Sequence, residues 1–214
     1  MLFSIIAHEY AHGYAALKQG DTTALSLGRL TWNPIKHIDP ILTIALPLLL
    51  AAMHGPIIGG ARPVPVDPRN YRNRRRGDII VSLAGVTTNV IIAIGCTIVV
   101  ALVGLAAKGI PALAPAFSIL QAMMVFGILL NFSLVIFNLL PIPPLDGSHV
   151  VKYLLPPKWA FHYQRVGFAG IVILLVLMRV GFIEWWFTPA LVATKFLSGL
   201  VDPLILPQAS AWLR

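Results

Sequence analysis

Two histidines and a glutamate stand close together near the start of the chain, in the pentapeptide His8-Glu9-Tyr10-Ala11-His12. If this segment is helical, residues four positions apart lie on the same face, so the imidazoles of His8 and His12 can hold one metal ion between them. The carboxylate of Glu9 then lies one position further round the helix, where it can act as a base. The pattern therefore indicates a metal site with a base beside it.

The surroundings of this motif decide between that interpretation and a simpler one. Motifs of five residues occur by chance in unrelated proteins, and two histidines on a soluble helix are more often ordinary surface or core residues. Here, however, the segment from Leu2 to Leu17 is otherwise apolar. Ionisable groups at membrane depth are energetically unfavourable and are usually functional. The apolar setting therefore favours the metal site.

The composition is that of an integral membrane protein: 57% of the 214 residues are hydrophobic, 11% are charged, and the mean hydropathy is +0.82. A spanning helix needs roughly 20 apolar residues, so the chain has room for about four or five spans and no separate soluble domain. The net charge of +8 comes from basic residues in short loops, where they set topology rather than bind nucleic acid. The lone cysteine, Cys96, excludes an internal disulfide.

The predicted membrane helices follow from the length of each apolar run. Two runs, Asp78 to Ala107 and Ala114 to Leu140, are long enough to cross a bilayer even when tilted. Val166 to Ile183 is a further span, and Thr188 to Leu206, which contains Pro203, is a weaker one. With the shorter segment that carries the histidines, the sequence predicts a bundle of about five transmembrane helices.

Shorter elements are expected between the first helix and the long spans. Ile41 to Met53 is apolar but too short, and too interrupted by Pro47, to be a span, so it is expected to enter the membrane and return. The segments 23–27 and 29–32, on either side of a glycine, fit two short strands. The predicted fold is thus all-α, with a re-entrant segment and a small membrane-associated β element.

Basic residues indicate which side of the membrane the loops face, because cytoplasmic loops carry an excess of lysine and arginine. One proposed face is flanked by Lys18, Arg29, Lys36, the cluster from Arg62 to Arg76, Lys152, Lys158 and Arg165. That face is therefore expected to be cytoplasmic, and the first helix to run from outside to inside. The metal site is then expected nearer the cytoplasmic side.

A catalytic zinc typically has three protein ligands and a fourth position for water, so two histidines are one ligand short. Among the eight acidic residues, Asp146 is the best candidate, because it stands at the end of a hydrophobic helix at a depth comparable to the histidines. The prolines before it stop that helix, and Gly147 permits a tight turn. The alternative is that Asp146 caps a short helix from Ser148 to Leu154, and at this point both interpretations remain open.

These residues resemble the site-2 proteases, a family of intramembrane zinc metalloproteases. The pentapeptide at His8 is similar to the family's HExxH helix, and residues 138–147, which read NLLPIPPLDG, are similar to its LDG element. Residues 37–40 and 61–70 resemble segments of compact members that lack PDZ and CBS domains. The resemblance covers residues 1–165 and implies a protease core there, with residues 166–214 adding C-terminal transmembrane helices to the same domain.

The resemblance implies zinc-assisted hydrolysis of peptide bonds within or near transmembrane segments. His8, His12 and Asp146 would hold Zn²⁺, and Glu9 would take a proton from water and return it to the leaving amine. The implied substrates are transmembrane proteins or signal-peptide remnants, in the cell membrane of a bacterium or an archaeon. No nucleic acid is expected as a partner.

Four further residues are expected to contact the substrate. Asn89 ends the segment 85–89, which resembles the family's Gly-Pro-x-x-Asn with valine in place of proline, and Asn138 matches a position of similar role. Either amide would bind the oxyanion, although an interhelical hydrogen bond is an equal alternative. Gly59 and Gly60 would offer a strand edge with which an unwound substrate pairs, or else form a plain turn.

Two rival functions follow from the same residues. Intramembrane histidines and acids also line ion paths, so a zinc-binding transporter is one alternative. A transporter, however, needs polar groups along a path through the bilayer, whereas here they gather at one depth. A non-catalytic membrane protein is the other alternative, but such a relative is expected to lose a ligand or the base, and all four residues are present.

Overall fold

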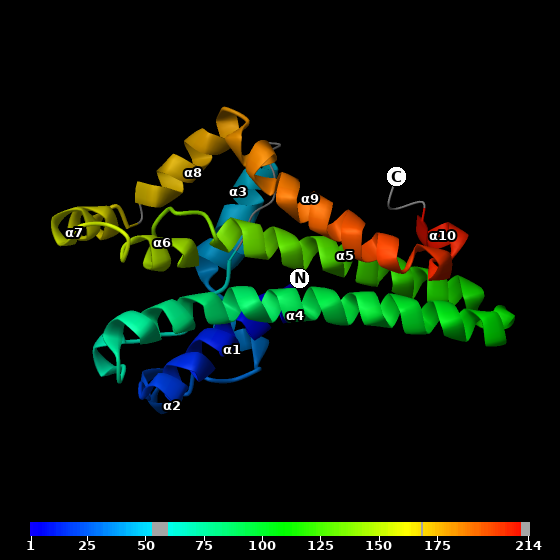
Figure 1. The fold of residues 1–214 in the computed structure, drawn as a ribbon, viewed down its shortest axis with the longest axis horizontal. Coiled ribbons are helices and arrows are strands. Elements are labelled where there is room, and N and C mark those ends of the chain that lie inside the picture. The colour runs from blue at the N-terminus through cyan, green and yellow to red at the C-terminus, as the bar shows by residue number, and fades with distance from the viewer. Residues whose placement is uncertain (53–59, 168, 211–214) are drawn as a thin grey trace. The chain divides into compact units, whose positions relative to one another are not determined.

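The computed structural model describes residues 1–52, 60–167 and 169–210, and these residues form helices joined by turns and loops (Figure 1). The α-helices are α1 (Leu2–Gln19), α2 (Thr23–Ser26), α3 (Leu46–Ala52), α4 (Arg74–Gly109), α5 (Ala114–Asn138), α6 (Asp146–Val151), α7 (Pro157–Arg165), α8 (Ala169–Arg179), α9 (Phe182–Leu200) and α10 (Pro207–Ser210). The short 3-10 turns are η1 (Pro34–His37), η3 (Pro68–Asn70), η4 (Pro111–Leu113) and η5 (Asp202–Leu204), and η2 (Pro40–Ala45) is a π-helix.

The predicted strands on either side of Gly28 are wrong. Thr23–Ser26 forms the helix α2, and residues 29–32 form no strand. The reason is local, because the carboxylate of Asp21 accepts hydrogen bonds from both the backbone N–H and the hydroxyl of Thr23 and so starts a helical turn. No β-strand occurs anywhere in the described residues, so the expected β element is not confirmed.

Contacts within the chain divide it into two units. The first unit contains residues 1–88 and 149–156, and the second contains residues 89–148 and 157–214. The helices α4 and α6 each begin in one unit and end in the other.

In the first unit, α1 packs against the beginning of α4. α1 ends at Gly20, whose φ of 108° lies in the left-handed region, and the backbone N–H groups that follow bond to the last turn of the helix. Ala16 of α1 forms a buried cluster with Tyr71 and with Val81 of α4. This contact holds the C-terminal part of α1 beside α4, one turn after His12.

Asp21 joins the end of α1 to the loop before α4. Its carboxylate is buried and accepts hydrogen bonds from Thr23, from the backbone N–H of Asp67 (2.7 Å) and from the side-chain amide of Asn70 (2.9 Å). Burial raises the pKa of Asp21, but these hydrogen bonds outweigh it and hold the pKa below its ordinary value. The loop 67–70 is thereby tied to the end of α1.

We expect Asp21→Asn to destabilise the fold by about 1–3 kcal/mol at neutral pH, because an amide cannot accept the full set of hydrogen bonds. Since the folded-state pKa is lowered, the stabilisation is fully present above the unfolded-state pKa and is lost as the pH falls through the folded-state pKa. Unfolding of the wild type and the variant in detergent, from neutral pH downward, measures this effect. The two stability curves should converge at acid pH, and a gap that stays constant would contradict the assignment.

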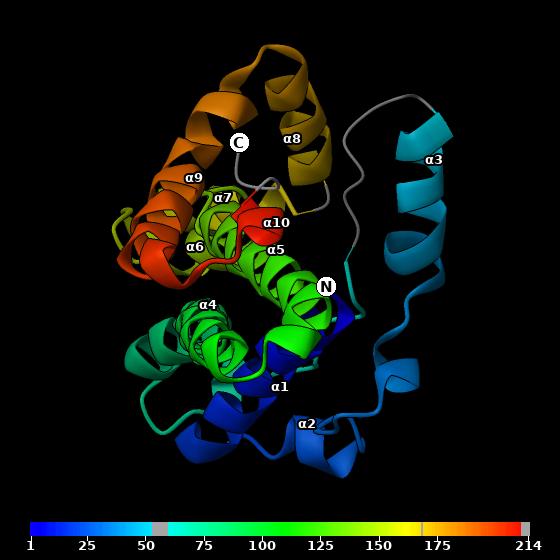
Figure 2. The same ribbon diagram turned by 90° about the vertical axis from the view of Figure 1, so that its right-hand side faces the viewer.

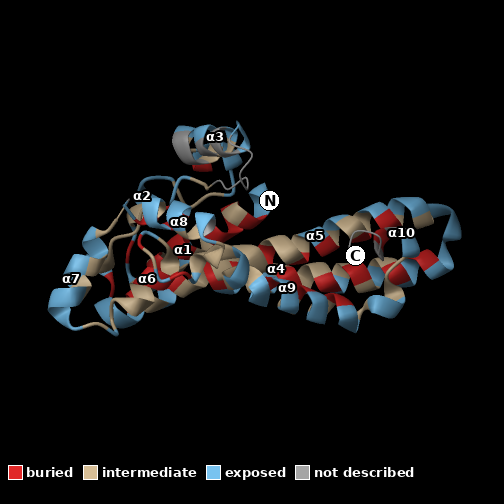
Figure 3. Cartoon of the chain, turned by 90° about the horizontal axis from the view of Figure 1, so that it is seen from above, coloured by how far each residue is buried: buried red, intermediate tan, exposed pale blue. Residues whose placement is uncertain are grey.

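In the second unit, α5 runs beside α9 (Figures 1 and 2). One face of α5 is buried at helical spacing, and it consists of Ser118, Gln121, Val125, Ile128, Asn131 and Val135. Half of these residues are polar, whereas large apolar residues such as Ile119, Met123 and Phe126 are exposed. Figure 3 shows buried and exposed residues alternating along these helices. Polar groups inside and apolar groups outside are typical of a helix surrounded by lipid.

Two helices are long and apolar enough to cross a membrane, namely α4 and the stretch Pro111–Asn138 that contains α5. This confirms two long apolar helices at the positions of the two long spans predicted from the sequence. The predicted span at 166–183 contains only the 11-residue helix α8, which gives a third span only as a pair with α7 that is bent by 80°. Among the described residues, length and composition therefore support two or three spans, and the expected number of about five is not confirmed.

The two remaining predicted membrane segments both contain helix. The segment expected to be re-entrant forms the π-helix η2 and α3 as far as Ala52, while Met53 lies outside the described residues. The weaker predicted span, 188–206, overlaps α9, which begins earlier, at Phe182, and ends at Leu200. Whether either segment enters the membrane stays a prediction.

Candidate metal centre

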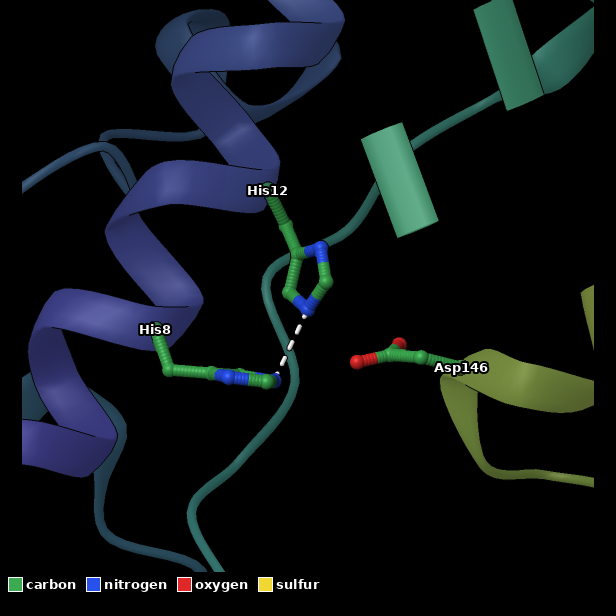
Figure 4. Close-up of side chains that lie close together, drawn as sticks. All are labelled: His8, His12 and Asp146. Atoms are coloured by element: carbon green, nitrogen blue, oxygen red, sulfur yellow. Dashed lines mark hydrogen bonds between the residues drawn. The ribbon is translucent and has the colours of Figure 1, made fainter. Parts of the chain in front are cut away.

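The two histidines of α1 meet on one face of the helix, as their spacing predicts (Figure 4). Their Nε2 atoms lie 2.9 Å apart, and the rings stand nearly perpendicular, with 4.6 Å between centroids. Both residues are buried, at 7% exposure for His8 and 9% for His12. Two buried imidazole nitrogens that face one another are a suitable pair of ligands for a single metal ion.

The tautomer of His12 follows from a hydrogen bond to α4. The Nδ1 atom of His12 lies 2.7 Å from the carbonyl oxygen of Val81. A carbonyl only accepts, so Nδ1 must carry the proton and donate it. In the neutral ring the lone pair is then on Nε2, the atom that faces His8. A ligating histidine is commonly oriented in this way by a carbonyl.

Gly85 of α4 leaves the space beside the two imidazoles open. A Cβ atom at this position would lie 2.5 Å from Cε1 of His8 and 2.6 Å from Nε2 of His12. Glycine in the middle of a helix is less favourable than alanine by about 1 kcal/mol, so its presence here needs a packing reason. The close approach of α4 to both rings provides that reason, and the arrangement fits a metal ion bound between the histidines.

Glu9 is half-buried on α1 and is oriented by the loop that precedes α4. Its Oε2 atom accepts a hydrogen bond of 2.8 Å from the backbone N–H of Val64. Val64 is itself buried against α1, where its side chain lies next to Gly13. Among the described residues the other oxygen, Oε1, accepts no hydrogen bond. The carboxylate is thus held at one oxygen and can receive a proton at the other.

The loop that orients Glu9 is fixed from its other side by Arg29. The Arg29 guanidinium donates to the carbonyl oxygens of Arg62 (3.0 Å) and Pro63 (3.4 Å). A cavity of about 610 Å³ lies along this loop and is lined by Leu27, Arg29, Asp39, Arg62, Pro63 and Pro65. The Val64 N–H that binds Glu9 therefore belongs to a backbone segment that is held in place by hydrogen bonds from Arg29.

Asp146 is the first residue of α6 and is half-buried. The helix begins two residues earlier than expected from the sequence and ends at Val151. A Cβ atom at Gly147 would lie 2.4 Å from the carbonyl oxygen of Leu139, so glycine is required for α6 to begin this close to the end of α5. The carboxylate thus sits at the start of a helix, a position compatible with capping and with metal binding alike.

The structure leaves the substrate contacts predicted from the sequence undecided. Asn89 is fully buried on α4, and the amide of Asn138 donates to the carbonyl oxygen of Leu134 in its own helix (2.9 Å). Gly59 lies outside the described residues, and the carbonyl oxygen of Gly60 accepts a hydrogen bond from the hydroxyl of Thr43 (2.7 Å). Their contact with substrate stays a prediction.

Two residues on α4 with a direct role at the histidines escaped the sequence analysis. Val81 acts through its backbone carbonyl, which no side-chain motif reveals. In the sequence, Gly85 stands only as the beginning of a segment that resembles a family pattern. Its own signal was an isolated glycine inside a long apolar helix, which indicates a close approach without indicating the partner.

Comparison with known proteins gives a consistent result. The sequence model of peptidase family M50 matches residues 1–178. YwhC of Bacillus subtilis, which its name proposes as a zinc metalloprotease, is 38% identical over 211 residues, covering 96% of this chain and 92% of the relative. Rip2 of Mycolicibacterium smegmatis, whose name also proposes a zinc metalloprotease, is 32% identical over 187 residues. The match covers 87% of this chain and 67% of the relative. No solved structure gives a significant match.

Two independent comparisons therefore agree with the resemblance found in the sequence, and both favour a hydrolase over a transporter. Zinc is the cofactor of this family, and the two facing imidazoles of α1 are suited to it. The chain belongs to peptidase family M50, the site-2 protease family, and is a zinc metalloendopeptidase.

Proposed function

We propose that this protein hydrolyses peptide bonds within or near the transmembrane segments of membrane proteins, at a zinc ion held by His8, His12 and Asp146. The main support is that the buried imidazoles of His8 and His12 face one another on α1 (Figure 4), and that Asp146 begins α6 within the segment that resembles the family's LDG element. Two imidazoles and a carboxylate are a common ligand set of catalytic zinc and leave a fourth position for water.

In the proposed mechanism, His8, His12 and Asp146 would hold the zinc ion, which would supply a water of lowered pKa and a Lewis acid for the scissile carbonyl. Glu9 takes the proton from the attacking water and later gives it to the leaving amine. The hydrogen bond from the Val64 N–H supports this role, because it fixes Oε2 and directs the carboxylate. The hydrogen bond from His12 to Val81 keeps that ring in the form that can bind metal.

The developing oxyanion needs a hydrogen-bond donor besides the metal. We propose that the amide of Asn89 or of Asn138 supplies it. The burial of Asn89 is compatible with an interior site, whereas Asn138 would first have to release the carbonyl oxygen of Leu134. A helical substrate must also unwind locally before its carbonyl is accessible, and Gly59 and Gly60 are proposed to pair with the freed backbone.

We further propose that the chain is a multi-pass protein of a bacterial or archaeal cell membrane and that the site faces the cytoplasmic half. The support is the run of exposed arginines before and at the beginning of α4, consisting of Arg69, Arg72, Arg74, Arg75 and Arg76. Such residues are typical of the cytoplasmic end of a span. Residues 1–165 would form the protease core and residues 166–214 further helices of the same domain.

Asp146→Asn tests the proposed site. The amide keeps the shape of the side chain but loses its charge and much of its affinity for zinc, so we expect zinc affinity to fall by more than about 100-fold, and turnover with it. Metal content and chelator competition on the purified full chain measure this. Asp202→Asn is the matched control, because Asp202 also begins a short helix but is exposed, and it should keep normal zinc. Normal zinc in Asp146→Asn would remove Asp146 from the ligands.

A further inference from the structure

A buried ionic cluster lies at the beginning of α4, within the first unit. Asp78 is 2% exposed and forms an ion pair with Lys152, whose side chain is 12% exposed. The hydroxyl of Tyr153 donates to Oδ2 of Asp78 (2.9 Å), and Nδ1 of His149 lies 3.4 Å from Oδ1. One carboxylate thus binds three side chains from the segment 149–153.

Such a cluster is weak evidence for stability, because buried ion pairs can often be replaced by apolar residues at no loss. Their best-attested use is to fix one element in a single register against another. Here the elements are α4, which carries Asp78, and the segment formed by the end of α6 and the residues after it. The cluster therefore sets where this segment sits along α4.

The same part of α4 also holds the two histidines. Asp78, Val81 and Gly85 are spaced by three and four residues, so they follow one another along one side of the helix. The carbonyl of Val81 binds His12, and Gly85 admits both imidazoles. Asp78 lies about 10 Å before Gly85 along the helix axis. The same two turns of α4 thus contact both the histidines of α1 and the segment 149–153.

Asp146 is connected to this cluster through α6. Asp146 and His149 are three residues apart in one continuous helix and so lie on the same side of it, and Lys152 follows directly after its end. We propose that Asp78 is a positioning residue that, through Lys152, His149 and Tyr153, fixes α6 and thereby orients the Asp146 carboxylate for zinc binding. This inference rests on the proposed function, in which Asp146 is the third zinc ligand.

The experiment uses the full chain in detergent and compares Asp78→Asn, Lys152→Met and the double variant. Three quantities are measured: zinc affinity by chelator competition, the visible spectrum of the Co²⁺-substituted protein, and thermal unfolding. Each single variant should weaken zinc binding about 10–100-fold, as is typical for loss of a residue that orients a metal ligand. Arg69→Met is the matched control, since it breaks the exposed ion pair with Asp67 and should leave zinc affinity unchanged.

The double variant separates positioning from simple stability. Each single variant leaves one charge of the buried ion pair uncompensated, which lowers thermal stability. The double variant removes both charges and should regain that stability. If the cluster positions Asp146, the double variant still binds zinc weakly and keeps an altered Co²⁺ spectrum. Recovery of both stability and zinc affinity would overturn the proposal, as would normal zinc affinity in the single variants.

A milder variant covers the case in which the charge variants do not fold. Tyr153→Phe removes one hydrogen bond to Asp78 and keeps the ring, and it should lower zinc affinity by several-fold with a shift of the Co²⁺ spectrum. Unchanged values would count against the proposal. If Asp146→Asn loses zinc but these variants do not, only the positioning role fails. If Asp146→Asn keeps normal zinc, the proposed ligand set is wrong, and the positioning role fails with it.

Discussion

Replacement of Glu9 by glutamine is expected to abolish cleavage of a reporter transmembrane substrate while bound zinc is retained. Glutamine has nearly the same volume, and its carbonyl oxygen can still accept the hydrogen bond from the Val64 N–H. It cannot, however, take a proton from water. General base catalysis contributes about 10²–10⁴-fold to rates, so kcat/KM should fall at least by that factor. Cleavage assays in liposomes, together with metal analysis of the same preparation, measure both quantities.

The control for this variant is Glu184→Gln, because Glu184 is an exposed glutamate in the first turn of α9. It should leave cleavage and zinc content unchanged. Cleavage by Glu9→Gln within tenfold of the wild type would exclude Glu9 as the base. Loss of zinc from Glu9→Gln would instead make Glu9 a ligand, which also contradicts the assignment.

Gly85→Ala is expected to have an effect of similar size for a steric reason. The added methyl group would lie 2.5 Å from Cε1 of His8 and 2.6 Å from Nε2 of His12. Both distances are shorter than a carbon atom can approach a heavy atom to which it is not bonded. The rings or the helix must then move, and the two nitrogens no longer face one another. We expect zinc affinity to fall by more than about 100-fold, beyond the loss seen for residues that only orient a ligand. Chelator competition on the purified variant measures this.

Gly95→Ala on the same helix provides the matched control. A Cβ atom at Gly95 meets nothing within 4 Å, so the substitution should be tolerated and should stabilise the helix by up to about 1 kcal/mol. The pair of variants thus compares the same chemical change on one helix, with and without the histidines beside it. Equal zinc affinity in both variants would mean that α4 does not approach the imidazoles as described.

The sequence predicts the long helices and the histidine pair well, because both depend on local patterns. α4 and α5 follow from apolar runs far longer than a soluble helix needs, and the facing rings of His8 and His12 follow from helical periodicity. The turn before Asp146 follows from the prolines and Gly147. In each case the information lies within a few neighbouring residues.

Prediction from the sequence fails where contacts with distant residues, or competing local contacts, determine the structure. The pattern at 23–27 predicts a strand, but the hydrogen bonds that Asp21 accepts from Thr23 start a helical turn, and Asp21 is in turn held by residues more than forty positions away. The roles of Val81, Gly85 and Asp78 depend on partners about 70 residues distant in the chain. Such pairings are tertiary and leave no periodic signal.

The most direct measurement of the central claim is X-ray absorption at the zinc edge, on the zinc-loaded full chain and on Asp146→Asn. We expect the wild-type spectrum to contain two imidazole ligands and oxygen ligands at about 2.0–2.2 Å, with no sulfur. The spectrum of any zinc that Asp146→Asn still binds should keep the imidazoles and lose the carboxylate. A wild-type spectrum without two imidazoles, or one that Asp146→Asn leaves unchanged, would contradict a zinc site formed by His8, His12 and Asp146.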